Sequence, residues 1–105
     1  MFGVRTENHK GKFRLESKPQ STGANQATYY FILERGAKIT DIFLYEYSPD
    51  KNLRIKMFLS LTESKTFNIK SNKLNAINLN FVSGGVLRCI VLGSTIMNFV
   101  LFYEV

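Results

Sequence analysis

Two side chains that commonly do nucleophilic or acid–base chemistry occur once each in this sequence, His9 and Cys89. A Ser–His–Asp or Cys–His site would need His9 as its base. His9 lies in a polar segment with no marked orienting acid, which indicates a surface histidine. Cys89 lies among aliphatic residues in VLRCIVLG, a setting typical of a small buried hydrophobic side chain rather than a reactive thiol. A single cysteine and a single histidine exclude an internal disulfide and a Cys/His zinc site.

The acidic residues and the glycines also lack the spacing of a known catalytic site. Paired carboxylates could come only from acids scattered along the chain, namely Glu34, Asp41, Glu46, Asp50 and Glu63. Asp41 shares a predicted strand face with Ile39 and Phe43, so we expect it to be paired or to lie at a rim. Gly11-Lys12-Phe13 lacks the rest of a P-loop, and no GxGxxG motif occurs. The sequence therefore predicts a protein that is not an enzyme, with no cofactor, no metal site and no small-molecule substrate.

The composition predicts one folded domain with a basic surface. The chain has 105 residues, of which 45% are hydrophobic, and its formal net charge is +6. Such a charge suits nucleic acid, an anionic membrane surface or an acidic partner. The N-terminus has no apolar segment typical of a signal peptide. The uncharged run Cys89–Tyr103 is too short and too interrupted for a spanning helix, and two strands joined by a turn explain it better.

The pattern along the chain predicts a basic arm followed by an all-β domain. Residues 1–27 are polar and basic, and we interpret them as an extended arm with a short strand at Lys12–Glu16. Residues 28–105 alternate between short apolar strands and turns, with no convincing helix. The strands predicted there are Thr28–Leu33, Ala37–Tyr47, Leu53–Leu61, Thr66–Lys70, Ala76–Val82, Val86–Leu92 and Ile96–Val105. About eight strands at this spacing predict a single antiparallel β-sandwich, jelly-roll-like in topology.

Turn residues separate these strands. Glu34-Arg35-Gly36 and Ser83-Gly84-Gly85 both read as tight turns, the second with a glycine at positive φ. Ser48–Asn52, with the sequence SPDKN, is the strongest turn signal in the chain. We therefore predict a hairpin between the strands on either side of SPDKN.

Several predicted strands are apolar on both faces, which a small sandwich cannot easily cover with its own loops. In Ile96–Val105, for example, Phe99 and Leu101 oppose Val100 and Phe102. Burial against further copies of the chain would remove this surface from water. The alternative is that the N-terminal arm folds back and covers one sheet. We favour the oligomer.

The segment Phe31–Tyr47, FILERGAKITDIFLYEY, resembles the entry strand, glycine turn and long strand of small jelly-roll capsid proteins. With the polar arm and the strand count, the chain resembles the penton, or vertex, proteins of tailless icosahedral phages that contain a membrane. This resemblance implies a homopentamer at the five-fold vertices in contact with neighbouring capsid proteins. It also implies an arm near the inner side of the shell, close to a membrane where there is one.

These inferences together predict a structural virion protein that is made in the host cytoplasm. It would assemble as a homo-oligomer through apolar strand faces and the basic arm, and the arm would face lipid, nucleic acid or protein. The predicted arm contacts are Arg5, Lys10, Lys12, Arg14 and Lys18. The predicted core and subunit-interface residues are Phe99, Val100, Leu101, Phe102 and Tyr103.

Two other functions fit the same sequence. The first is a single-stranded nucleic-acid-binding module, such as an OB-like barrel, in which aromatic residues stack on bases beside Arg54 and Lys56. The aromatic residues concerned are Tyr29, Tyr30, Phe31, Phe43, Tyr45 and Tyr47, and at strand spacing such rings are more commonly core residues. The second is a carbohydrate- or receptor-binding β-sandwich, which the absence of tryptophan weakens.

Overall fold

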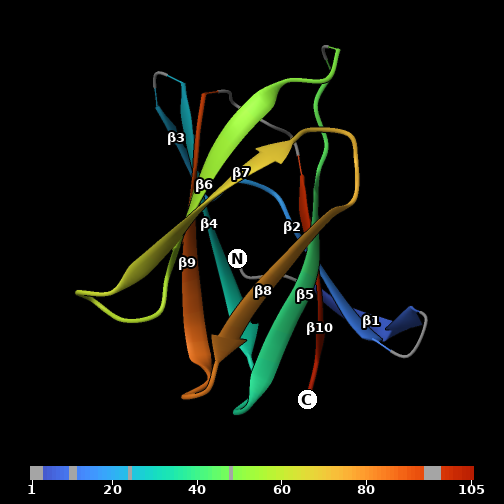
Figure 1. Ribbon diagram of the computed structural model, residues 1–105, viewed down its shortest axis with the longest axis vertical. Helices are drawn as coiled ribbons and strands as arrows, with labels where there is room; N and C mark the ends of the chain where they lie inside the picture. Colours follow the sequence, from blue (N-terminus) through green and yellow to red (C-terminus); the bar gives the residue numbers. More distant parts are fainter. Residues whose placement is uncertain (1–3, 10–11, 24, 48, 94–97) are drawn as a thin grey trace.

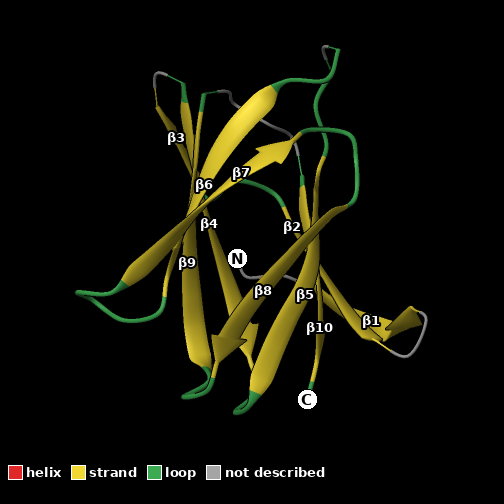
Figure 2. Cartoon of the chain, viewed as in Figure 1, coloured by secondary structure: helices red, strands yellow, loops and turns green. Residues whose placement is uncertain are grey.

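The computed structural model shows two five-stranded antiparallel sheets packed face to face (Figures 1 and 2). It describes the chain except residues 1–3, 10–11, 24, 48 and 94–97, and it describes residues 4–9 as backbone only. The ten strands are β1 (Val4–His9), β2 (Lys12–Ser17), β3 (Ser21–Gly23), β4 (Gln26–Leu33), β5 (Ala37–Leu44), β6 (Asn52–Phe58), β7 (Ser64–Lys70), β8 (Asn75–Phe81), β9 (Gly85–Leu92) and β10 (Phe99–Glu104). The described residues contain no helix, so the predicted all-β sandwich is confirmed.

The strand order is that of a jelly roll. Sheet A has the order β1-β2-β10-β5-β8, and sheet B has the order β3-β4-β9-β6-β7. Without β1 and β3, each sheet has four strands, and the chain passes from one sheet to the other at every connection between these eight strands except the one between β6 and β7. All pairs are antiparallel, as in the eight-stranded double Greek key.

The segment predicted to be an arm belongs to the sandwich instead. Strand β2 pairs with β10 from Phe13↔Tyr103 to Ser17↔Phe99, and Leu15 is part of the hydrophobic core. Strand β1 pairs with β2, and β3 pairs with β4. The predicted boundary at residue 28 is therefore wrong. The polar composition was misleading because β2 contributes only two apolar side chains to the core, Leu15 and the partly buried Phe13.

A β-bulge in β5 changes which residues face the core. Opposite β10, Phe102 pairs with Asp41 and Tyr103 pairs with Ile39, so Thr40 is the extra residue. The bulge shifts the alternation by one position, and Ile39, Ile42 and Leu44 are all buried. Regular alternation along the sequence predicts Ile39 and Ile42 on opposite faces of the strand. The apparent two-sided apolar pattern of this strand is thus a consequence of an unrecognised bulge.

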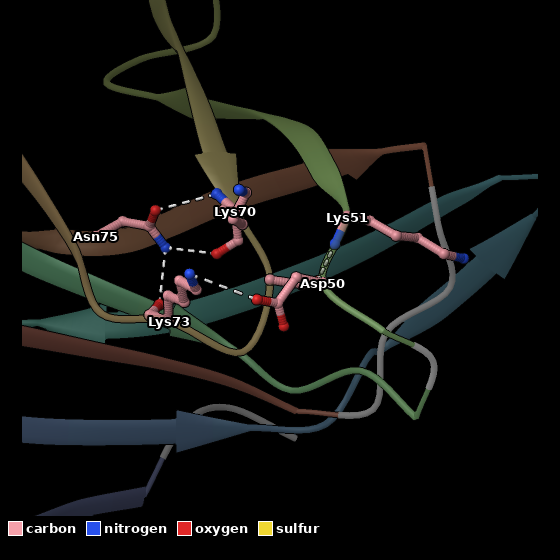
Figure 3. A network of polar contacts seen from close by, with 6 residues as sticks. Asp50, Lys51, Lys70, Lys73 and Asn75 are labelled. Carbon is pink, nitrogen blue, oxygen red and sulfur yellow. Dashed lines mark hydrogen bonds and ion pairs between the residues drawn. The ribbon is translucent and has the colours of Figure 1, made fainter.

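The strands around SPDKN do not form a hairpin, because β5 lies in sheet A and β6 in sheet B. The connection crosses between sheets and is tied to the β7–β8 turn. Figure 3 shows that turn: the Asn75 side chain accepts a hydrogen bond from the Lys70 N–H at 3.0 Å and donates to the carbonyls of Lys70 and Lys73. The buried Ser71 hydroxyl accepts a hydrogen bond from the N–H of Lys51 at 2.8 Å. Turn chemistry correctly predicted a connection between these two strands, but the predicted pairing of the strands is wrong.

The core between the sheets is aromatic at its centre. Phe99 of β10 lies 5.2 Å from the Tyr29 ring and 5.1 Å from the Phe31 ring, measured between ring centroids. Tyr29 and Phe31 belong to β4, so these contacts join the two sheets. Cys89 is fully buried, as its aliphatic setting predicted.

Candidate interaction surfaces

The predicted arm residues lie in different surroundings. Lys12 and Arg14 face the outer side of sheet A and form ion pairs within the chain, with Asp41 at 2.7 Å and Glu16 at 2.6 Å. Lys18 is exposed. Lys10 lies outside the described residues, as does the side chain of Arg5. Contact of these five residues with a partner remains a prediction.

The Lys12–Asp41 ion pair spans strand β10. Lys12 belongs to β2 and Asp41 to β5, and β10 runs between these two strands. Phe102 of β10 pairs with Asp41 and with Arg14, so the charged side chains lie around its ring on the outer face. Burial alone would raise the pKa of the Asp41 carboxyl. Hydrogen bonds from Lys12 and Thr40, together with the Lys12 charge, outweigh burial and hold that pKa below its ordinary value.

This pair predicts a specific pH dependence. A carboxyl whose pKa is lower in the folded than in the unfolded chain stabilises the fold above the unfolded pKa, near 3.9, and this stabilisation is lost as the pH falls through the folded pKa. We expect Asp41→Asn to flatten the fall of stability between about pH 5 and pH 2 in urea titrations. Asp50→Asn is the control, because Asp50 lies 3.6 Å from Lys73 in an exposed pair. Equal flattening by both variants would contradict the prediction.

The five residues predicted as core and interface are all buried within one chain. Phe99, Leu101 and Tyr103 belong to the core cluster between the sheets. Val100 and Phe102 point to the outer side of sheet A, yet only 1% and 8% of their surfaces are exposed. Strand β2 pairs with β10 in the same sheet, and its long charged side chains border Val100 and Phe102 on that outer side. The apolar character of β10 on both sides is therefore accounted for without a second copy.

Sheet B, in contrast, has a basic outer face. Its five strands contain five lysine or arginine residues and no aspartate or glutamate. The strands of sheet A contain four of each sign. The cross-strand register places four of the basic residues of sheet B on its outer face: Arg54, Lys56, Lys70 and Arg88. None of these four forms an ion pair with a described carboxylate.

An aromatic ring lies within this basic face. Phe58 of β6 pairs with Arg88 of β9, and the guanidinium carbon lies 4.0 Å from the ring centroid. The Lys56 ammonium lies 5.6 Å from the same centroid. Tyr30 pairs with Arg88 from the other side. These distances are those of cation–π contacts, which hold the Arg88 guanidinium over the ring of Phe58.

Two hollows lie along the same face, one toward each end of β6. The first has a volume of about 430 Å³ and is lined by Tyr30, Phe58, Arg88 and Val86 together with the loop 59–61. The second has a volume of about 500 Å³ and is lined in part by Arg54, Asn68 and Leu92. An arginine thus lies in the wall of each hollow.

This arrangement corrects the predicted aromatic–basic cluster. Tyr29 and Phe31 are core residues. Phe43 belongs to sheet A and Tyr45 to the connection that follows, and their rings pack on each other with centroids 4.7 Å apart. Arg54 and Lys56 lie in sheet B. Of the predicted aromatic residues, Tyr30 shares the outer face of sheet B with the two cations, whereas Phe43 and Tyr45 do not, and an OB-like barrel is not formed. Phe58 was missed because only the pairing of β6 with β9 brings it to Arg88.

The groups with catalytic potential do not gather into a site. No set of three metal-ligating side chains occurs among the described residues. Burial raises the pKa of the Cys89 thiol, which opposes formation of a thiolate. The side chain of His9 lies outside the described residues. In the part of the chain that is described, no helix is long and apolar enough to cross a membrane.

Comparison with known proteins adds little. No protein-family model matches the sequence, and no curated protein matches it. Solved structures do match, among them a chain from a structure titled "CBM4 structure and function". That alignment covers 94% of this chain and 73% of the other, with 9% sequence identity and a TM-score of 0.36. Similarity at this level carries no argument about function.

Proposed function

We propose that this protein is a structural subunit that assembles with further copies of itself, in a virion shell of the kind its sequence resembles. The observation that supports self-assembly is strand β8, an unprotected edge of sheet A. The jelly-roll strand order fits the proposal, since this topology is common in viral capsid proteins, although lectin domains share it.

Edge strands present unpaired N–H and C=O groups, and proteins that remain monomeric usually protect such edges with charges, proline or short length. Three of the four edges here are protected. Strand β3 has three residues, β1 contains Arg5 and Glu7, and β7 contains Lys65 and Lys70. Strand β8, with the sequence NAINLNF, has seven residues without a charge or a proline.

The side chains of β8 leave this edge accessible. Ala76, Asn78 and Asn80 are small or uncharged, and all three are exposed. A groove of about 250 Å³ lies at the end of the strand, lined by Asn80–Ser83, Leu59 and Glu63. In the described structure, β8 has a ladder partner only in β5, so a strand from another copy could pair along its outer side.

The test is the solution mass of the full chain, measured by light scattering at low and high salt. We expect a defined oligomer that persists in high salt, because backbone pairing and apolar contacts are weakly screened. A pentamer would support the vertex assignment. We expect the double variant Asn78→Lys, Asn80→Lys to be monomeric with an unchanged circular dichroism spectrum, since lysines on an edge oppose strand addition.

The matched control adds the same two charges to the other long edge. Thr66 and Asn68 are exposed residues of β7, and the double variant Thr66→Lys, Asn68→Lys should leave the mass of the oligomer unchanged. A parent chain that is monomeric at micromolar concentration would contradict the proposal. So would loss of assembly in both variants, because the effect would then come from net charge.

A further inference from the structure

We propose that the outer face of sheet B binds single-stranded nucleic acid, with phosphates on its cations and bases stacked on the Arg88–Phe58 pair. This inference goes beyond assembly and uses a different surface from the β8 edge. It rests on three features of the described residues: uncompensated positive charge, a stacking platform, and hollows at both ends of the face.

The charge of the face suits an anionic partner. The four cations come from β6, β7 and β9, three neighbouring strands, so they cover most of the width of the sheet. The nearest acids along the chain are in turns and connections, and Asp50, which precedes β6, forms an exposed ion pair with Lys73 at 3.6 Å. Glu34, after β4, accepts a hydrogen bond from the Tyr103 hydroxyl at 2.9 Å, and Glu63 lies in the β6–β7 loop. Lysine and arginine arranged in this way neutralise a row of phosphates and release their counterions.

The Arg88–Phe58 pair offers a flat surface for a base. Bases of single-stranded nucleic acids stack on aromatic rings and on guanidinium planes. The contact of 4.0 Å with Phe58 fixes the Arg88 guanidinium, so a base that stacks there loses little additional side-chain freedom. Because Phe58 is only partly buried, the ring edge is accessible beside it.

The hollows fit an extended ligand better than a compact one. Arg54 lines one hollow and Arg88 the other, and Arg54 and Phe58 of β6 are four residue steps apart, about 13 Å along the strand. The same face carries exposed polar side chains suited to hydrogen bonds with phosphates and base edges. On β4, β6 and β7 these are Gln26, Asn52, Thr66 and Asn68.

An anionic membrane is the competing partner. Aliphatic side chains more than half exposed gather at one end of the face, where Ile32 pairs with Val86 beside Leu61 of the β6–β7 loop. The cations and hydrogen-bonding residues instead extend over its length. Two apolar side chains, Ile90 and Leu92, do lie among the cations, but both are partly buried. Insertion into lipid would need exposed apolar side chains there, so the distribution favours a chain of phosphates and bases.

The first test measures how much the positive charges contribute to the affinity for an oligonucleotide. Full-length protein is titrated into a fluorescein-labelled oligodeoxythymidine, and anisotropy is followed over a series of salt concentrations. We expect the double variant Arg54→Gln, Lys56→Gln to lower affinity about tenfold at low salt and to reduce the slope of log affinity against log salt by about 1.4. The matched control, Lys18→Gln with Lys38→Gln, removes the same charge from exposed sites outside this face and should change neither quantity appreciably.

The second test isolates stacking. Arg88→Lys keeps the charge but loses the planar guanidinium, so affinity should fall about fivefold with an unchanged salt slope. Phe58→Leu should have a similar effect. Tyr45→Leu is the control, because Tyr45 is an exposed aromatic residue outside this face. Circular dichroism spectra and the mass of the oligomer should be the same in every variant, which separates this inference from the assembly proposal.

Three results would overturn the inference. The first is an equal loss of affinity in the two double variants, which would mean that net charge alone binds the oligonucleotide. The second is an Arg88→Lys variant as tight as the parent. The third is saturable binding to phosphatidylserine-containing vesicles without measurable binding to the oligonucleotide, which would assign the face to a membrane.

Discussion

Replacing Phe99 with alanine is expected to lower the free energy of unfolding by about 4 kcal/mol. The ring is fully buried, and it touches Tyr29 and Phe31 across the interface between the sheets. Alanine would leave a cavity in the middle of the core and remove two aromatic pairs. Since small domains are stable by only about 5–15 kcal/mol, the variant should be largely unfolded well below the parent's melting temperature.

Urea denaturation followed by circular dichroism measures this effect, because the chain has no tryptophan to report by fluorescence. Phe99→Leu is the control for cavity size, and we expect it to cost about 1–2 kcal/mol. Phe58→Ala should cost less than Phe99→Ala, since Phe58 lies on the outer face and is only partly buried. If Phe99→Ala and Phe58→Ala had the same effect, the core assigned here would be wrong.

Replacing Gly84 with alanine is expected to lower the free energy of unfolding by about 3 kcal/mol. Gly84 has a φ of +68°, in the left-handed region that L side chains rarely adopt. A Cβ atom there would lie 2.8 Å from the backbone nitrogen of Arg35 and 2.9 Å from its Cα. These atoms belong to the β4–β5 turn, which cannot move without disturbing both strands. Figure 1 shows this turn beside the β8–β9 turn at the lower end of the sandwich.

Gly85→Ala separates the effect of backbone strain from the effect of the steric clash with the Arg35 backbone. Gly85 also has a positive φ, of +99°, but no atom lies within 4 Å of a Cβ built on it. Gly85→Ala should therefore lower the free energy of unfolding only through backbone strain, by about 1–2 kcal/mol. Thermal unfolding of both variants measures the difference. A smaller loss for Gly84→Ala than for Gly85→Ala would show that the two turns do not pack as described.

Both proposed surfaces became visible only from the strand order. In the sequence, the cations of sheet B are spread from Arg54 to Arg88, and aromatic residues occur along the whole chain. Pairing of β6 with both β7 and β9 gathers the cations on one face. The same strand order leaves β8 unpaired on one side. No spacing along the chain could have indicated either feature, since both depend on contacts between distant strands.

Local patterns in the sequence determined the strands, most of the turns and the class of fold. Alternating side chains predicted eight of the strands, β2 and β4 to β10, to within a few residues, and glycine or proline marked the turns, because both signals act over two to five residues. The burial of Cys89 also followed from its neighbours.

Only the tertiary structure decided which strands pair. The β5 bulge, the crossing at SPDKN and the recruitment of β2 to sheet A each depend on partners distant in sequence, such as β10. Hydrogen bonding between strands carries little sequence information, because the backbone groups that form it are the same in every residue. The basic face of sheet B, the open edge of β8 and the covered surface of β10 all follow from that pairing. The two proposed interaction surfaces therefore depend on the tertiary structure.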